Sequence, residues 1–262
     1  MPSEHPYVGI DVAKDTLLVS MGGAWSNHLH ALAHAAQLCA LPCLGLVRGL
    51  RNPHAALTPT LQDCDDLGMR LHYLSRETYR QLRLSPTLWQ TEIQEDPRRC
   101  LWLPEGGMSS VALRGVAELI DELDFIPDTI VTACGTGTTL AGLVAGMQGQ
   151  GRVLGIAAVQ NAHFLAPQVT TLLQQAAYPA WQNFEIRTDF DHGGFGKISP
   201  SLRDFCLRFE HDYHIDIEPV YTGKMLYAVH QLAHSHYFRP GERVIVVHTG
   251  GLQGKRGYPE FT

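Results

Sequence analysis

The chain has 262 residues, 45% of them hydrophobic, and carries a formal net charge of −6. This length can bury the core of one large or two modest domains, and an acidic balance without a basic block argues against a nucleic-acid partner. The six cysteines have no paired spacing, so we expect free thiols in a reducing cytoplasm and no zinc site. No signal peptide or membrane-spanning apolar run is visible, and we expect no membrane partner.

Apolar runs typical of buried strands alternate with helical stretches along the chain. The strands are predicted over 17–21, 43–47, 129–132, 153–156 and 244–247. The helices are predicted near 28–40, 56–67, 108–123, 139–148, 161–177, 200–212 and 223–236. This alternation predicts an α/β fold with open parallel sheets. The stretch 75–99 is the least regular, and the Pro-Glu-Gly-Gly phrase at 104–107 predicts a hinge between a small lobe (15–103) and a large lobe (104–262).

A glycine- and threonine-rich turn follows the strand predicted at 129–132 and precedes a helix. Small side chains there let backbone amides close around an anion, threonine hydroxyls add donors, and the helix directs its positive end at the same place. The turn consists of Gly135, Thr136, Gly137, Thr138 and Thr139. We predict a phosphate-binding turn; the alternative is an ordinary connection between a strand and a helix.

Two common nucleotide motifs do not fit this turn. A dinucleotide fold needs G-x-G-x-x-G and an acidic residue about twenty positions on, but the third glycine here comes late, at Gly142. A Walker loop needs a lysine, and the turn has none. The phosphate is therefore expected to belong to a compact cofactor.

Other polar or glycine-rich loops follow predicted strands. Ser26 or Asn27 can cap the first helix while facing a ligand, although capping alone would also explain them. The loops at 191–197, 218–224 and 248–251 are expected beside the start of this helix, because ligands gather at the carboxyl ends of parallel strands. His28, His30 and His34 do not predict a metal site, since no carboxylate or cysteine accompanies them.

Six phrases occur together in one order: GGAWSNH, LPEGG, CGTGTTLAG, GGFGK, EPVYTGK and VVHTGG. In that order they resemble the pyridoxal-phosphate enzymes of the tryptophan-synthase β type (fold type II), and more narrowly the 1-aminocyclopropane-1-carboxylate deaminase / D-cysteine desulfhydrase family. The resemblance spans Asp15 to about Gly254. It implies two lobes of open parallel sheets, a pyridoxal 5'-phosphate cofactor, a small amino-acid substrate and a homodimer.

The resemblance also implies roles for individual residues. Gly135 to Thr139 would bind the cofactor phosphate, and Asn27 would hydrogen-bond the pyridine ring oxygen. Ser26 and His28 would hold the substrate carboxylate or approach its leaving group, with Tyr221 near the substrate. Thr222 would face the pyridine nitrogen, where the deaminase branch has a glutamate. A neutral hydroxyl there favours β-elimination of a thiol from a cysteine-like amino acid, giving pyruvate, sulfide and ammonia.

One feature of the family is missing from the sequence. The family carries its Schiff-base lysine in a Gly-Asn-Lys phrase ahead of the first matching strand, and no such phrase occurs here. The resemblance implies that this lysine would fall before the first residue, together with strands of the large lobe and its linking helix. Lys197 and Lys224 belong to matching phrases, and Lys14 precedes the first strand, so none is an expected replacement. We therefore expect an N-terminally truncated, impaired and aggregation-prone lyase.

The first residues resemble a different protein. Tyr7 to Leu17 (YVGIDVAKDTL) is similar to the amino-terminal strand of certain insertion-sequence transposases, in which an aspartate matched by Asp11 binds a metal. The other carboxylates of that site have no visible counterpart, so we give Asp11 no catalytic role. Residues 1–14 would then be an unrelated mobile-element segment; a chance hydrophobic strand is the alternative. Two other functions stay open: a non-catalytic binder of pyridoxal phosphate or another phosphorylated ligand, and a decayed gene product.

Overall fold

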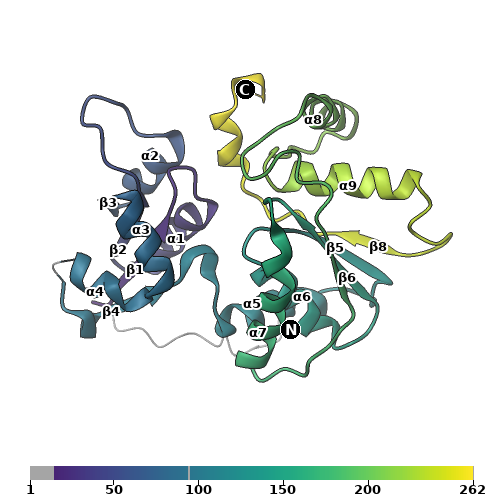
Figure 1. Cartoon of the computed structure of the whole chain (residues 1–262), viewed down its shortest axis with the longest axis horizontal. Coiled ribbons are helices and arrows are strands. Elements are labelled where there is room, and N and C mark those ends of the chain that lie inside the picture. Colours follow the sequence, from purple (N-terminus) through teal and green to yellow (C-terminus); the bar gives the residue numbers. More distant parts are fainter. Residues whose placement is uncertain (1–14, 94, 262) are drawn as a thin grey trace, which may run out of the picture.

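The computed structural model describes residues 15–93 and 95–261. The predicted segment 1–14, with Asp11, Lys14 and most of the transposase-like phrase, lies outside the described residues. The described chain forms two lobes, each built on a four-stranded parallel sheet (Figure 1). The α/β fold with two open parallel sheets is thus confirmed.

The sheet of the small lobe has the strand order β3-β2-β1-β4. Its strands are β1 (Leu17–Gly22), β2 (Cys43–Arg48), β3 (Met69–Leu74) and β4 (Cys100–Leu103). Helices α1 (Asn27–Leu38) and α2 (Pro59–Asp66) pack on one face, and α3 (Arg76–Leu84) and α4 (Trp89–Glu92) on the other. The central strand β1 is buried along its whole length, because both faces of the sheet are covered.

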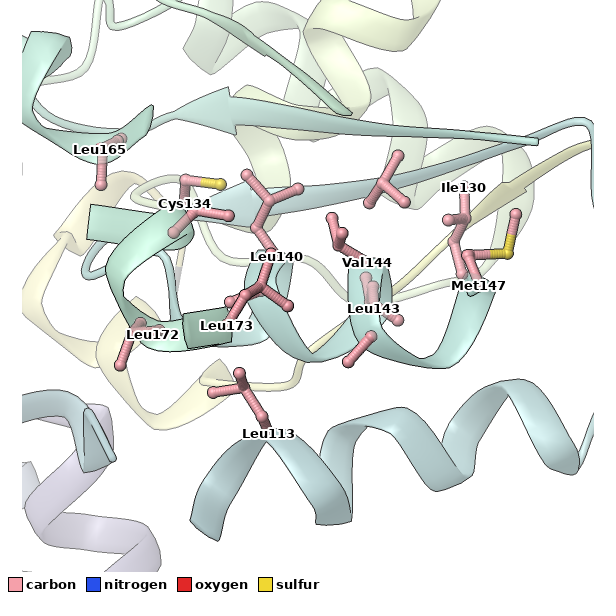
Figure 2. Packing of buried hydrophobic residues seen from close by; sticks show 14 of the residues in the cluster. Leu113, Ile130, Cys134, Leu140, Leu143, Val144, Met147, Leu165, Leu172 and Leu173 are labelled. Atoms are coloured by element: carbon pink, nitrogen blue, oxygen red, sulfur yellow. The ribbon is translucent and has the colours of Figure 1, made fainter. Parts of the chain in front are cut away.

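The sheet of the large lobe has the order β7-β6-β5-β8. Its strands are β5 (Thr129–Cys134), β6 (Arg152–Ala157), β7 (Phe184–Arg187) and β8 (Val244–Val246). One face is covered by α5 (Ser110–Asp121), α6 (Thr138–Met147) and α7 (Leu165–Gln175), with α6 almost entirely buried between β5, β6 and α5 (Figure 2). On the other face lies α9 (Thr222–His234), which packs against α8 (Pro200–Tyr213). No helix of the described residues is long and apolar enough to cross a bilayer.

The strands that the sequence did not predict all lie at sheet edges. All five predicted strands are present, four of them one to two residues longer. The missed strands are β3, β4 and β7. In β3 and β7 apolar and polar residues alternate, as in Phe-Glu-Ile-Arg, because an edge strand is only partly covered. A search for continuous apolar runs therefore passes over β3 and β7, although it finds the apolar edge strand β8; the short apolar strand β4 was missed without such a reason.

The C-terminal segment joins the lobes a second time. After β8 the chain forms the 3₁₀ helices η5 (Leu252–Gly257) and η6 (Pro259–Phe261), drawn between the lobes in Figure 1. Gln253 Nε2 donates to Asn27 Oδ1 at 2.6 Å, and the Arg256 guanidinium pairs with the Asp63 carboxylate. We call residues 252–258 the strap. It connects the large lobe to α1 and α2 of the small lobe.

Candidate active site between the lobes

The predicted phosphate turn lies at the carboxyl end of β5, directly before α6. Gly137 occupies the N-cap of α6 with a φ of 80°, a left-handed conformation that glycine adopts without strain. No side chain among the described residues caps this helix end, and the first N–H groups of a helix have no intrahelical acceptor. The Thr136 and Thr138 hydroxyls lie 3.0 Å apart beside it. The turn is therefore an open group of donors at the positive end of a helix.

Two close approaches distinguish this turn from an ordinary connection between strand and helix. A methyl group placed at Gly106 would lie 2.6 Å from Thr136 Cγ2, so the linker between the lobes passes directly over the turn. A methyl at Gly135 would lie 3.1 Å from Cε1 of Tyr221. The turn is thus enclosed by the interlobe linker and by the residue that precedes α9.

A pocket of about 210 Å³ lies between the lobes. The small lobe, the glycine loop at 191–197, the start of α9 and the strap all contribute to it. Its lining consists of Trp25, Asn27, Phe195, Gly196, Glu218, Val220, Tyr221, Gly254, Gly257 and Tyr258. Of the predicted site residues, Asn27 and Tyr221 therefore line one pocket, although they are far apart in sequence. Tyr221 also joins this pocket to the phosphate turn through Gly135.

The residues after β1 are positioned by capping and by the strap. Ser26 is the N-cap of α1, and its Oγ accepts a hydrogen bond from the Leu29 N–H at 3.2 Å. This uses an acceptor site of Ser26 but leaves its hydroxyl hydrogen available. Asn27 Oδ1 accepts from Gln253, which leaves the Asn27 amide hydrogens as donors. Ser26 itself is not among the pocket-lining residues.

His28 turns away from the pocket towards the sheet and the linker. The Ser20 hydroxyl donates to the Leu103 carbonyl at 2.7 Å, so His28 Nε2, 2.7 Å from the same hydroxyl, is assigned as its donor. The imidazole lies close to Gly107. Burial lowers the pKa of His28 below 6.5, and the charge of Glu105 partly opposes this shift. The lowered pKa favours the neutral ring.

A buried carboxylate fixes Tyr221 and Thr222. Glu218 accepts hydrogen bonds from the N–H groups of Val220, Tyr221 and Thr222 at 2.7, 2.8 and 2.6 Å. Burial raises the pKa of the Glu218 carboxyl, and these hydrogen bonds oppose the rise. Burial, and next the nearby Glu218 charge, raise the pKa of Tyr221 well above its ordinary value, so its hydroxyl stays protonated.

Thr222, the predicted partner of the ring nitrogen, is completely buried. Its hydroxyl lies 3.1 Å from the Glu218 carbonyl and 3.2 Å from Glu218 Oε1, and it accepts from the Glu218 N–H at 3.0 Å. Thr222 is not among the residues that line the pocket. The structure therefore brings Tyr221 to the pocket and places its neighbour behind it.

None of the lysines within residues 15–93 and 95–261 lines the pocket. Lys224 is fully buried, and its Nζ donates to the carbonyls of Gly194 at 2.7 Å and Ala158 at 3.2 Å. Burial lowers the pKa of Lys224 to about 8. Lys197 is exposed, and Lys255 pairs with Glu210 at 2.6 Å. Lys224 thus fastens the glycine loop to the end of β6.

Several residues of the pocket have little local signal in the sequence. Trp25 packs against Gly257, and Tyr258 donates its hydroxyl to the Gly196 carbonyl at 3.1 Å. The glycines after β8 were the available signal, but only the fold shows that they reach the opposite lobe. His30 Nε2 lies 3.2 Å from Asp63 Oδ2, and the described residues contain no group of three potential metal ligands.

The fold is that of a pyridoxal-phosphate dependent enzyme. Residues 12–250 match the family model of that description, and the chain belongs to this family. Within it, the chain is 27% identical over 276 residues to a 1-aminocyclopropane-1-carboxylate deaminase from Mesorhizobium japonicum, with 92% of this chain and 78% of that protein covered. It is 24% identical over 266 residues to a bifunctional D-cysteine desulfhydrase/1-aminocyclopropane-1-carboxylate deaminase from Arabidopsis thaliana, with 94% and 66% covered. The resemblance to this branch is confirmed.

Solved structures support the same fold. An ACC deaminase homologue gives a TM-score of 0.80 at 24% identity, with 92% of this chain and 76% of that chain covered. Serine racemase from Dictyostelium discoideum gives 0.60 at 14% identity, with 91% and 77% covered. At these identities the likeness concerns the two-lobed architecture.

The residues of this chain fit the phosphate end of pyridoxal phosphate, the cofactor of the family. The open N-terminus of α6 offers N–H donors for a dianion, with the Thr136 and Thr138 hydroxyls beside them. Asn27, with free amide hydrogens, lines the adjoining pocket. Gly135 to Thr139 would hold the phosphate and Asn27 the ring oxygen.

Proposed function

We propose that the chain binds pyridoxal 5'-phosphate between its lobes and that its site is arranged for β-elimination of a thiol from a cysteine-like amino acid. With water, this reaction gives pyruvate, sulfide and ammonia. The observation that carries the proposal is the packing of Tyr221 on Gly135, which connects the phosphate turn to the pocket lined by Asn27. The relationship to the deaminase and desulfhydrase branch supports this choice of substrate class.

The bound cofactor would withdraw electrons from the α-carbon of the substrate. The chain's own residues have simpler tasks. Tyr221 keeps its proton and can donate a hydrogen bond to the sulfur of the departing thiolate. In this proposal the Ser26 hydroxyl hydrogen, which the capping bond leaves available, binds the substrate carboxylate at the edge of the pocket. Trp25, Phe195 and Tyr258 wall the pocket and limit the access of water.

We propose further that turnover by this chain alone is weak. Schiff-base chemistry needs a lysine amine at the pocket. The Lys224 amine is engaged by two carbonyls, and the Lys255 amine is paired with Glu210. A non-catalytic binder of pyridoxal phosphate is therefore the second candidate, and the positions of these lysines favour it.

Binding is tested by equilibrium dialysis with pyridoxal phosphate. The double variant Thr136→Ala/Thr138→Ala should bind at least about tenfold more weakly, because each hydroxyl can make a charge-assisted hydrogen bond. The matched control Thr170→Ala/Thr171→Ala changes two hydroxyls that bond helix carbonyls on α7 and should bind like the unmodified chain. No saturable binding by the unmodified chain would contradict both candidates and support a decayed gene product.

Borohydride reduction after incubation with the cofactor separates the two candidates. Peptide mass mapping then locates any modified lysine. Stoichiometric labelling of one lysine, with sulfide and pyruvate formed from D-cysteine, would identify a working enzyme. Saturable binding with only sparse, scattered labelling would identify a binder. An aminocyclopropane carboxylate assay in parallel tests the deaminase reaction.

A further inference from the structure

A second, strongly basic pocket lies on the small lobe. It has a volume of about 420 Å³ and is lined by Arg48, Arg76, Tyr79, Arg80 and Arg83. Arg48 ends β2, and the other four residues belong to α3. None of these residues lines the pocket between the lobes. The basic pocket is therefore a separate feature.

The arginines of this pocket are only partly neutralised. Arg80 and Arg83 follow Arg76 by four and seven residues. The three arginines therefore share one face of α3 and repel one another. Arg83 pairs with Glu105 at 2.5 Å, and Arg80 reaches Glu77 at 3.4 Å. Within residues 15–93 and 95–261, Arg48 and Arg76 have no carboxylate partner at ion-pair distance. The net charge of the whole chain is −6, so this positive cluster is local.

Tyr79 provides a rigid centre for the cluster. Its side chain is 2% exposed, and its hydroxyl donates to Glu105 Oε1 at 2.6 Å. The guanidinium carbons of Arg48 and Arg83 lie 5.8 and 5.7 Å from the centre of its ring. Cation–π attraction to a fixed ring holds both guanidinium groups near the pocket.

We propose that this pocket binds a small molecule bearing a diphosphate group. Guanidinium groups recognise phosphate oxygens through paired, charge-assisted hydrogen bonds, and two adjacent phosphates can engage several arginines at once. Such a ligand relieves the repulsion along α3 and neutralises Arg48 and Arg76. The volume accommodates a compact anion. An extended nucleic acid does not fit a single positive cluster on an acidic chain.

The test uses the whole chain labelled with ¹⁵N-arginine and titrated with inorganic pyrophosphate. The Nε–Hε signals of the arginines report binding at the guanidinium groups themselves, which separates this pocket from the phosphate turn before α6. We expect saturable shifts of a small set of signals, including those lost in the variant Arg76→Gln/Arg80→Gln. Calorimetry should give an affinity at least about tenfold lower for that variant.

The matched control is Arg203→Gln/Arg208→Gln, which changes two exposed arginines of α8 and should bind pyrophosphate like the unmodified chain. Circular dichroism should show the same thermal transition for all three proteins, because the substituted side chains lie at the surface. Competition by ADP would identify a nucleoside diphosphate as the source, and its failure would point to a free diphosphate. Equal affinity of the unmodified chain and Arg76→Gln/Arg80→Gln, or shifts scattered over the arginine signals, would overturn the proposal.

Discussion

Two helices of the large lobe begin beside the same pocket, and their N-termini are satisfied in opposite ways. At α9, the Glu218 carboxylate accepts the N–H groups of Val220, Tyr221 and Thr222. At α6, Gly137 provides no side chain, and the donors of the first turn remain open. One helix end carries its own anion, whereas the other leaves room for an external one.

This difference assigns a task to each helix. The internal carboxylate of α9 fixes the backbone around Tyr221, so the side chain that lines the pocket has one position. The open end of α6 keeps its donors and its positive dipole for a ligand. In the proposed function the N-terminus of α6 binds the phosphate, and it is open because Gly137 at the N-cap has no side chain that could satisfy it.

Closing the open end should have the largest effect. Thr136→Asp places a carboxylate beside the α6 N-terminus and makes it resemble α9. We expect pyridoxal phosphate to bind about a thousandfold more weakly, since like charges about 4 Å apart near a protein surface repel by about 4 kcal/mol. Equilibrium dialysis measures the loss. The neutral isostere Thr136→Asn should lose far less, and equal losses in the two variants would contradict an electrostatic explanation.

Opening the closed end should destabilise the protein. Glu218→Ala removes the acceptor of three backbone N–H groups, and we expect the free energy of unfolding to fall by roughly 2–3 kcal/mol. Urea titration without cofactor measures this change. The control Glu122→Ala, at the exposed C-cap of α5, should alter stability by less than about 0.5 kcal/mol. An unchanged unfolding midpoint for Glu218→Ala would show that the carboxylate is not what satisfies α9.

The linker that covers the open end should respond to pH through His28. Because burial lowers the pKa of His28, its stabilising contribution is complete above pH 6.5 and is lost as pH falls through the lowered folded value. His28→Gln should flatten stability against pH in this acidic range. It should also cost about 1 kcal/mol at neutral pH, through the lost bond to Ser20. Denaturation midpoints from pH 7 to 5 test this, with exposed His54→Gln as the control; a slope identical to that of the unmodified chain would rule out His28.

The smallest effect is expected at the strap. Arg256→Gln removes an ion pair with Asp63 whose two side chains are 40% and 30% exposed. Exposed pairs of this kind contribute about 0.2–1 kcal/mol, so thermal stability should fall only slightly. Calorimetry at low and high salt should show that the difference narrows as salt is added. A loss of cofactor binding comparable to that of Thr136→Asp would mean that the strap, and not α6, governs the site.

Much of the fold could be predicted from the sequence because buried strands and amphipathic helices have direct periodic patterns. The central strands β1, β2, β5 and β6 were found in this way, whereas the edge strands β3 and β7 carry charged residues and were missed. The turn ahead of α6 was located because a small-residue turn before a helix is a local signal, and its binding of phosphate stays a prediction. Glu218 was overlooked as a pocket residue. Its carboxylate accepts hydrogen bonds from backbone N–H groups only because the following residues turn into α9.

Nonlocal contacts account for the rest. Nothing near Trp25 in the sequence indicates that it meets Gly257, and nothing near Lys224 indicates that its amine binds Gly194 and Ala158. The first contact depends on the arrangement of the two lobes, and the second on the packing of α9 against the end of β6 within the large lobe. The roles of Ser26, Asn27, His28 and Thr222 towards the cofactor remain predictions, with Asn27 at the pocket and Thr222 behind it.

The strap has a mechanical consequence. The lobes are joined at two separate places, by the linker at residues 104–107 and by the strap (Figure 1). Two bodies connected at two points keep one easy movement, a swing about the line through both joints, while twisting and sliding are resisted. Such a swing would leave the hydrogen bond between Gln253 and Asn27 in place. The two lobes would thus rotate about an axis that passes through the linker and the strap.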